Sequence, residues 1–283
     1  MRHRMTWIDT HVHLVDDPSW MTGERMRPLR RRFTSTDLRA DAGDATPASI
    51  VTVPALPTLD ETRRSLRHAA GDPLVGAVVG WIEPTTRDID GVIDALRSAP
   101  GGDLLTGFRN PVQRMPGDEW LRRADVHGGL RRIGAHGLRY ELLVRPDQLG
   151  AAVDAVRRCP GVRFVLNHGG NPPSDPDAFA RWRADVSALA ARPNVVCKLS
   201  GPMLHGPTTP VANRAGEAVR ILLEQFGARR MVIGSNYPMC TLDSTYRQTR
   251  NRAIDLLDQA GASSTEVRSV LSAVALGEAT PEG

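Results

Sequence analysis

Two histidines stand one residue apart near the start of the chain, as His11 and His13. On an extended backbone, residues i and i+2 point to the same side, so the two imidazoles would converge. Such a pair could ligate one metal ion, or it could bind one substrate oxygen through hydrogen bonds. Asp9 precedes the pair, and we expect it to support the histidines rather than to react.

Charged side chains fall at or near the ends of later apolar runs. Glu83 is our first choice for a general base, because burial would raise the pKa of a carboxyl group into the range that base catalysis needs. Glu141 is the other candidate base, and we also expect it among the substrate-binding residues. The structural alternative for each is a pairing with an arginine such as Arg109. Arg109 itself could bind a substrate carboxylate bidentately or form an internal salt bridge. Lys198 could also bind substrate, or it could point into the core and pair with Glu141 or Glu83.

Aromatic side chains near the same run ends could form the walls of a binding site. They are Trp81, Tyr140 and Tyr237, and packing in the core is the alternative for each. Asp243 and Cys240 follow the last apolar run, and Cys240 as a nucleophile is the more remote option.

Eight short, nearly continuously apolar runs recur along the chain, as buried parallel strands require. Segments with a 3.6-residue apolar period separate several of them. This alternation predicts an α/β fold of the (β/α)₈ type, the TIM barrel, whose functional side chains gather at the C-terminal ends of the strands. An open doubly wound sheet is the rival, but no Gly-x-Gly-x-x-Gly motif follows the first strand. The predicted strands are Thr6–Asp9, Ile50–Leu56, Leu74–Glu83, Leu104–Arg109, Gly137–Val144, Val162–His168, Val195–Ser200 and Met231–Ser235, and the predicted helices are Asp88–Ser98, Asp147–Arg158, Asp177–Ala191 and Ala212–Phe226.

Length and composition suit one such barrel. The chain has 283 residues, of which 41% are hydrophobic and only 5% aromatic, so its core must be mainly aliphatic. We expect a single domain over residues 1–283. Residues 16–39 are rich in Pro, Arg and Met and have no clear period. They would form the first βα loop, as a lid or substrate-facing loop, with a mobile surface insertion as the alternative.

Cysteine usage and hydropathy favour a cytoplasmic location. The three cysteines, Cys159, Cys197 and Cys240, are odd in number and form no Cys-x-x-Cys pair, so no disulfide framework is expected. No apolar run approaches the roughly 18 residues of a membrane helix, and the N-terminus has no apolar stretch of signal-peptide length. We therefore expect no membrane partner, whereas a homo-oligomer remains open.

Basic residues give the chain a net charge of +4, and 35 of its 36 Lys and Arg residues are Arg, spread along the chain. The one dense cluster lies between Arg25 and Arg32. A solvated face is the favoured interpretation, and a contact with an acidic substrate or partner is the alternative. No nucleic-acid motif accompanies the cluster, so we expect a small-molecule substrate and no nucleic-acid partner.

Seven segments at or near the predicted strand ends resemble the amidohydrolase superfamily, in the branch that includes fuconolactonases and other sugar or dicarboxylate lactonases. The resemblance covers nearly the whole chain, and its Lys-Leu-Ser-Gly and Gly-Ser-x-x-Pro pieces are fairly specific to this branch. It implies that His168 faces the cavity together with His11 and His13. The segments are Asp9–His13, Val79–Glu83, Gly107–Arg109, Leu138–Val144, Phe164–His168, Asn194–Gly201 and Ile233–Pro238.

Two amides depart from the pattern of the branch. Asn236 stands where its lactonases carry an aspartate that is expected to be the general base or a metal ligand, and Asn167 replaces an aspartate before His168. An amide cannot take up a proton near neutral pH, although it can orient a water or donate to an oxyanion. The loss of two carboxylates weakens the case for a tightly held metal. One Zn²⁺ on His11, His13 and His168 and a metal-free site both remain open.

The leading hypothesis is a hydrolase that opens a lactone, or a similar cyclic ester or amide, of a small polar or carboxylated substrate. The substrate would lie between the three histidines and Arg109, with Glu83 assisting the attacking water and Asn236 orienting the water or the oxyanion. A non-hydrolytic enzyme on the same scaffold, such as a decarboxylase, cyclase or isomerase, is the first alternative, motivated by the missing aspartate. A catalytically silent binding protein is the second, because a fold alone does not fix a function.

Overall fold

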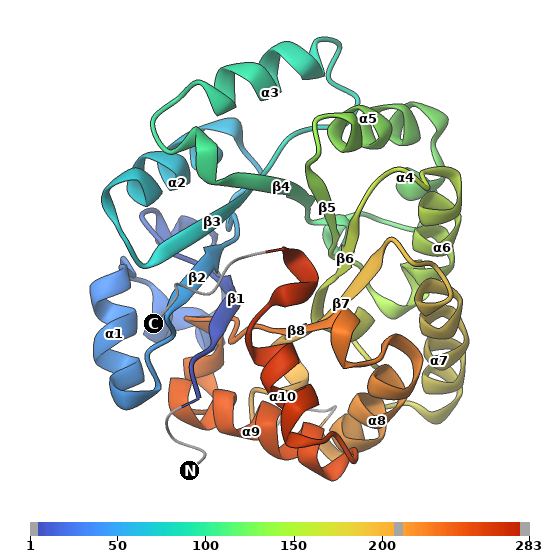
Figure 1. Ribbon diagram of the computed structural model, residues 1–283. Coiled ribbons are helices and arrows are strands. Elements are labelled where there is room, and N and C mark those ends of the chain that lie inside the picture. Colours follow the sequence, from blue (N-terminus) through green and yellow to red (C-terminus); the bar gives the residue numbers. More distant parts are fainter. Residues whose placement is uncertain (1–4, 207–211, 278–283) are drawn as a thin grey trace.

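The computed structural model describes residues 5–206 and 212–277. Eight parallel strands pair in the order of the sequence, and helices surround them (Figure 1). This confirms the predicted (β/α)₈ fold, and a strand is present at each of the eight predicted positions. The strands are β1 (Ile8–Val12), β2 (Ser49–Thr52), β3 (Val75–Gly80), β4 (Leu105–Asn110), β5 (Arg139–Leu142), β6 (Phe164–Leu166), β7 (Val195–Leu199) and β8 (Met231–Ile233).

The outer ring contains the four predicted helices, here α3, α6, α7 and α8, and further helices that the apolar period did not predict. The unpredicted α2 and α9 bury polar side chains such as Glu61 and Arg250 beside apolar ones, so apolar residues alone did not mark their inner faces. The helices are α1 (Ser35–Ala42), α2 (Leu59–Gly71), α3 (Ile89–Arg97), α4 (Glu119–Arg122), α5 (Ala124–Ala135), α6 (Leu149–Arg158), α7 (Pro176–Ala190), α8 (Ala215–Phe226), α9 (Tyr246–Gln259) and α10 (Ser264–Leu271). None of those in the described ranges is long and apolar enough to span a membrane.

The strands are buried on both faces, and alternation along β6 shows how. Phe164 and Leu166 belong to the large core between sheet and helices, whereas Val165 belongs to a smaller, separate cluster. Because successive side chains point to opposite faces, this smaller cluster fills the barrel interior. It includes Ile8, Val51, Ala77, Val79, Val165 and Val232.

The barrel closes between β1 and the segment that follows β8. The Thr10 hydroxyl donates to the Ile233 carbonyl at 2.6 Å, the Asn236 N–H to the His11 carbonyl at 2.9 Å, and the His13 N–H to the Tyr237 carbonyl at 2.8 Å. These bonds bring the histidines of β1 directly against the chain after β8, at the end of the barrel where active sites of this fold occur.

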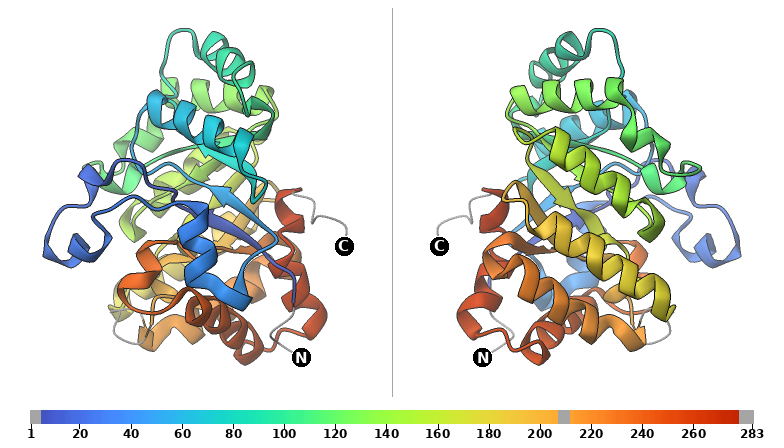
Figure 2. Two further views of the ribbon diagram at one scale, coloured as in Figure 1. Left: turned by 90° about the vertical axis from the view of Figure 1, so that its left-hand side faces the viewer. Right: turned by 90° about the vertical axis from the view of Figure 1, so that its right-hand side faces the viewer.

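The first βα loop stands out from the barrel body (Figure 2). Its last part is helical, contrary to the irregular loop that we expected over residues 16–39. Helix α1 begins at Ser35 because the Thr34 side chain and Asp37 form a reciprocal capping box, a signal that the interpretation overlooked.

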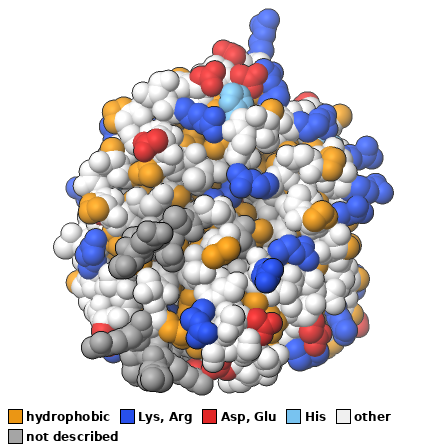
Figure 3. Space-filling model, viewed as in Figure 1, with side chains coloured by type: hydrophobic (Ala, Val, Ile, Leu, Met, Phe, Trp, Pro, Cys, Tyr) orange, Lys and Arg blue, Asp and Glu red, His pale blue; other side chains and the backbone are white. Residues whose placement is uncertain are grey.

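Two arginines of this loop form ion pairs with acidic residues of the same loop. Arg31 pairs with Asp37 at 2.8 Å, and Arg32 pairs with Asp16 at 2.6 Å. These contacts of exposed arginines agree with the favoured interpretation of the arginine cluster as a solvated face. On the opposite end of the molecule, drawn in Figure 3, basic and acidic side chains are also interspersed.

Candidate active site

A pocket of about 170 Å³ opens where the strands end. Its wall brings together His11, His13, Arg109, His168 and Asn236, all of which the sequence placed in the site. Among the described residues that line it, there is no aspartate or glutamate. The wall is completed by Trp20, Pro54, Ala55, Leu56, Pro57, Trp81, Pro111, Gln113, Arg114, Leu143 and Met239.

Both histidines of the His-x-His motif reach the pocket because β1 is irregular. The register between β1 and β2 shifts between Asp9 and Val12. Ile8, before the shift, faces the barrel interior, whereas Val12, after it, packs into the outer core, so the histidines on either side of Val12 face inward. His11 lies inside β1, not after the strand as predicted. A Cβ on Gly234 would come within 2.4 Å of the His11 Cβ, so only glycine lets the segment after β8 pass this close.

Asp9 supports this arrangement from outside the pocket, as expected. Its carboxylate accepts hydrogen bonds from the backbone N–H groups of His11 at 3.1 Å and Ser235 at 2.8 Å. The Tyr246 hydroxyl of α9 donates to it at 2.7 Å. The carboxylate therefore fixes the backbone of the motif and not an imidazole ring.

His13 presents an unprotonated nitrogen to the pocket. Its Nδ1 lies 3.1 Å from the carbonyl oxygen of Val53. A carbonyl can only accept, so Nδ1 carries the proton and Nε2 keeps its lone pair. Burial, reinforced by the positive charge of Arg109, lowers the pKa of His13 to about 3. The ring is therefore neutral near neutral pH.

His168 is held in a left-handed backbone conformation, with φ 54°, directly after β6. Non-glycine residues rarely adopt this conformation, and it is frequent at functional sites. The His168 Nδ1 is 2.8 Å from the Ser200 hydroxyl. A Cβ on Gly201 would come within 2.5 Å of the same nitrogen, so the Ser-Gly pair after β7 shapes the space for this ring. The ring centroids of His168 and His11 are 4.8 Å apart.

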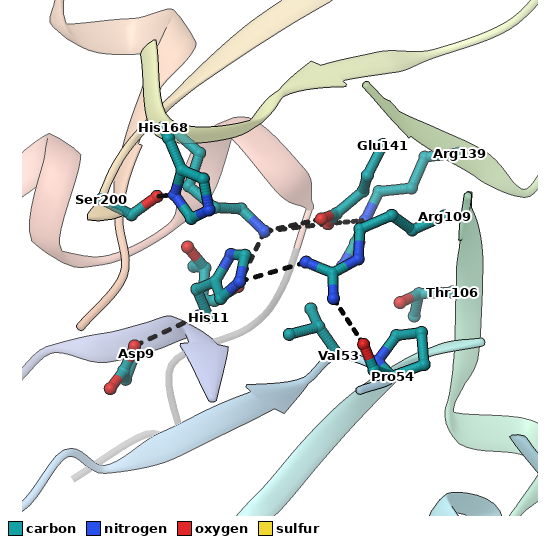
Figure 4. A network of polar contacts seen from close by, with 12 residues as sticks. Asp9, His11, Val53, Pro54, Thr106, Arg109, Arg139, Glu141, His168 and Ser200 are labelled. Atoms are coloured by element: carbon teal, nitrogen blue, oxygen red, sulfur yellow. Dashed lines mark hydrogen bonds and ion pairs between the residues drawn. The ribbon is translucent and has the colours of Figure 1, made fainter. Parts of the chain in front are cut away.

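Arg109 inserts its guanidinium among the imidazoles (Figure 4). Its Nη1 is 3.2 Å from His11 Nε2, and its Nη2 donates to the Pro54 carbonyl. Because a guanidinium can only donate, His11 Nε2 accepts, and the proton of this ring lies on Nδ1. That Nδ1 is buried without a hydrogen-bond partner in the described structure.

The charge states follow from burial. Burial, and then the positive Lys198, holds the pKa of His11 well below its usual range. Burial, and then Arg109, does the same for the pKa of His168. Burial lowers the pKa of Arg109 only to about 10, so this side chain stays positive near neutral pH. The pocket thus combines three neutral imidazoles with one buried cation.

Glu141 and Lys198 form a fully buried ion pair instead of a substrate contact. The Lys198 ammonium donates to both Glu141 oxygens at 2.9 Å and to the Thr10 carbonyl at 2.8 Å. Neither side chain lines the pocket. This corrects the expectation that they bind substrate, and it fulfils the alternative that Lys198 points into the barrel and pairs with Glu141. Despite burial, Lys198 and Arg139 hold the pKa of the Glu141 carboxyl below its usual range.

Three further side chains that we expected in the pocket point elsewhere, so these predictions are wrong. Glu83 does not line the pocket; its carboxylate accepts from the Thr85 hydroxyl at 3.1 Å. Tyr140 alternates with the inward-facing Glu141, so it packs in the outer core. Tyr237 also lies in the outer core, and its hydroxyl donates to Asp41 at 2.7 Å. Trp81, by contrast, does line the pocket.

Replacement of Glu83 by glutamine is therefore expected to leave kcat/KM within about twofold of the wild-type value, as for a substitution outside the site. Steady-state kinetics on a turned-over substrate would check this. A loss of a hundredfold or more would restore Glu83 as the general base.

The sequence interpretation missed several residues at or beside the pocket, among them Trp20, Arg114 and His205. Trp20 and Arg114 line it from loops after β1 and β4. His205 lies behind Asn236, with its Nε2 3.1 Å from the Asn236 amide nitrogen. The sequence could have indicated His205, because it is a histidine shortly after the seventh strand. The irregular sequence around Trp20 gave no comparable indication.

A three-histidine zinc site does not fit these contacts. The Arg109 guanidinium donates a hydrogen bond to His11 Nε2, with Nη1 3.2 Å away. A metal cation could not bind to the same nitrogen beside this positively charged donor. Within residues 5–206 and 212–277, no group of three or more His, Cys, Asp or Glu side chains is arranged to hold one metal ion. We therefore derive no step through a metal.

The chain belongs to the amidohydrolase family, whose model matches residues 8–273. It is 31% identical over 238 residues to an L-fucono-1,5-lactonase of Burkholderia ambifaria, covering 83% of this chain and 81% of the relative. A crystal structure of a Burkholderia multivorans amidohydrolase with bound zinc is 26% identical, with a TM-score of 0.87 over 96% of this chain and 98% of the other. A 2-pyrone-4,6-dicarboxylic acid hydrolase of Pseudomonas putida shares the fold at 22% identity, with a TM-score of 0.74 over 97% and 98% of the two chains.

Proposed function

We propose that this protein is a hydrolase that opens the ring of a lactone, on a small polar or carboxylated substrate. The observation that carries the proposal is the buried Arg109 cation, hydrogen-bonded to His11 in the wall of a pocket that His13 and His168 also line. Such a pocket suits a carbonyl that becomes negatively charged as water adds to it. Curated relatives that are named L-fucono-1,5-lactonases, and cover most of the chain, support the same reaction class.

Three polar groups of the pocket wall have a part in this reaction. Arg109 stabilises the oxyanion that forms when water attacks the lactone carbonyl carbon, and His11 orients the guanidinium by accepting its hydrogen bond. His13 Nε2, the lone-pair nitrogen, takes the proton from the water. With a pKa of about 3 this ring is a weak base in the free enzyme, and the negative charge that develops on the carbonyl oxygen favours its protonation. The ester C–O bond of the ring then breaks, and the leaving oxygen receives from His13 the proton that the water gave up. The product is an open-chain hydroxy acid.

Arg114 suggests that the substrate carries a negative charge. It is exposed at the pocket wall, and no ion pair joins it to any residue of the described structure. With Arg109, it makes the wall positive, and no lining carboxylate opposes it. Bidentate pairing of such a guanidinium with a substrate carboxylate would add to affinity.

A panel of lactones tests both the function and the charge. L-fucono-1,5-lactone serves as a neutral probe and 2-pyrone-4,6-dicarboxylate as an anionic one, each followed with and without a chelator. We expect turnover of at least one probe that survives chelation. Replacement of Arg114 by methionine is expected to raise KM for the anionic probe about tenfold and to leave a neutral probe unchanged. Equal effects on both probes would remove Arg114 from charge recognition.

A non-hydrolytic reaction is the second candidate, and the pocket gives it one specific support. None of its lining side chains, within the described residues, is a carboxylate that could serve as a strong base for water. A decarboxylase, cyclase or isomerase would need no attacking water. A silent binding protein differs from both, because its ligand would be recovered unchanged.

We also propose that the protein works in a reducing compartment, the cytoplasm. Its three cysteines are free and buried. Most proteins of the cytoplasm keep their cysteines reduced, whereas disulfides form mainly in oxidising compartments. Cell fractionation with a tagged chain would test the location, and light scattering would determine whether the protein forms a homo-oligomer.

A further inference from the structure

His205 is a buried histidine whose imidazole contacts a residue of the pocket wall. It follows β7, is only 7% exposed, and does not itself line the pocket. Its partner Asn236 does line the pocket, and the Asn236 backbone is fixed in a left-handed conformation, φ 61°, by the hydrogen bond from its N–H to the His11 carbonyl. The hydrogen bond between the two side chains, His205 Nε2 to Asn236 Nδ2, is 3.1 Å long.

The direction of this hydrogen bond follows from the atoms. An amide NH₂ can only donate, so His205 Nε2 must accept and the ring proton must lie on Nδ1. The Asp243 carboxylate, with Oδ2 3.9 Å from Nδ1, favours that tautomer. Arg25 in turn holds Asp243, because its Nη2 donates to both carboxylate oxygens at 2.7 and 2.9 Å.

His205 remains an acceptor near neutral pH. Burial lowers its pKa to about 4, with Asp243 opposing the shift and Arg25 adding to it. His168 also lies within electrostatic range. The amide nitrogen of Asn236 therefore stays hydrogen-bonded to His205, whereas no described residue donates to its amide oxygen.

We propose that His205 is a positioning residue, which turns the Asn236 amide so that its oxygen, and not its nitrogen, faces the pocket. The oxygen can then accept a hydrogen bond from the attacking water and hold it in place. Asn236 would thus keep the water-orienting half of the work of the missing aspartate and leave proton uptake to another group. This inference rests on the proposed lactone hydrolysis for its kinetic consequence, but not for its structural one.

The kinetic test compares two replacements at His205. In His205→Leu the acceptor is lost, and we expect kcat to fall about 10- to 100-fold with KM within about threefold. In His205→Gln a carbonyl oxygen replaces the accepting nitrogen, and we expect kcat to recover to within about fivefold of wild type. His127→Leu is the matched control, since His127 is a buried histidine of α5, outside the pocket lining, and its loss should leave kcat unchanged. A His205→Leu enzyme with wild-type kcat would overturn the proposal.

A spectroscopic test does not depend on turnover. Nitrogen-15 NMR of the imidazole rings, with the His205 signals assigned by their absence from His205→Gln, reports which ring nitrogen carries the proton. We expect His205 Nε2 to be unprotonated at pH 7 in the wild type. A proton on Nε2 would mean that the amide faces the other way, and the proposal would fail. If no lactone is hydrolysed, this result still decides the orientation, so the two proposals can fail separately.

Discussion

Replacing Arg109 by methionine is expected to lower kcat for lactone hydrolysis by about 10²–10³-fold, the usual cost of removing one oxyanion donor from a desolvated site. Arg109 is the buried cation of the pocket wall, and the methionine would also leave His11 Nε2 without its donor. Because the interaction strengthens only as negative charge develops, kcat and kcat/KM should fall by similar factors. Steady-state kinetics on the best lactone of the panel would measure this.

Arg109→Lys is the matched variant. It keeps the charge but loses the fork that reaches His11 and the Pro54 carbonyl together, so we expect only partial recovery. Melting temperatures of both variants would show whether the fold is intact. An Arg109→Met enzyme that is folded and retains activity within tenfold of wild type would remove this residue from the chemistry.

Replacing Lys198 by methionine is expected to destabilise the protein by about 3–5 kcal/mol, because it removes the ammonium that donates to both Glu141 oxygens. Within the described residues, only Arg139, 3.7 Å away, then remains to pair with this carboxylate in the barrel interior. Both side chains are fully buried, so solvent cannot substitute for the lost partner. For a chain of this size the melting temperature should fall by on the order of 10 °C, which calorimetry or circular dichroism would record.

Two further variants isolate the cause. The double replacement Lys198→Met/Glu141→Gln removes the orphaned charge, so we expect it to restore at least about half of the lost stability. Arg220→Met breaks an exposed pair with Glu224 and should change the melting temperature by no more than about 2 °C. If the double variant is as unstable as the single one, the buried charge is not the reason.

The sequence predicted five site residues that lie at or just after the ends of strands. His11 and Arg109 lie in the last two residues of β1 and β4, and His13, His168 and Asn236 follow β1, β6 and β8 by at most three residues. Side chains at this end of a barrel often line the pocket, as these five do, although Glu83 after β3 does not. The predicted fold was equally secure, since eight buried strands with intervening helices have few other arrangements.

The remaining site residues could not be predicted, because a strand has two faces. Tyr140 and Glu141 are neighbours in β5, yet one packs outward and the other inward, and a one-residue difference in register exchanges them. Sequence alone also cannot show that Lys198 neutralises Glu141, or that Glu83 turns to Thr85. His205 acts through Asn236, from a loop whose path no periodicity describes.

The most direct measurement of the proposed reaction is lactone turnover in ¹⁸O-labelled water, with a chelator present and mass spectrometry of the ring-opened product. Attack of water on the carbonyl carbon places one ¹⁸O atom from solvent in the new carboxylate of each product molecule, and that is the result we expect. A product without ¹⁸O, or a bound lactone that is recovered unchanged, would contradict hydrolysis at this site.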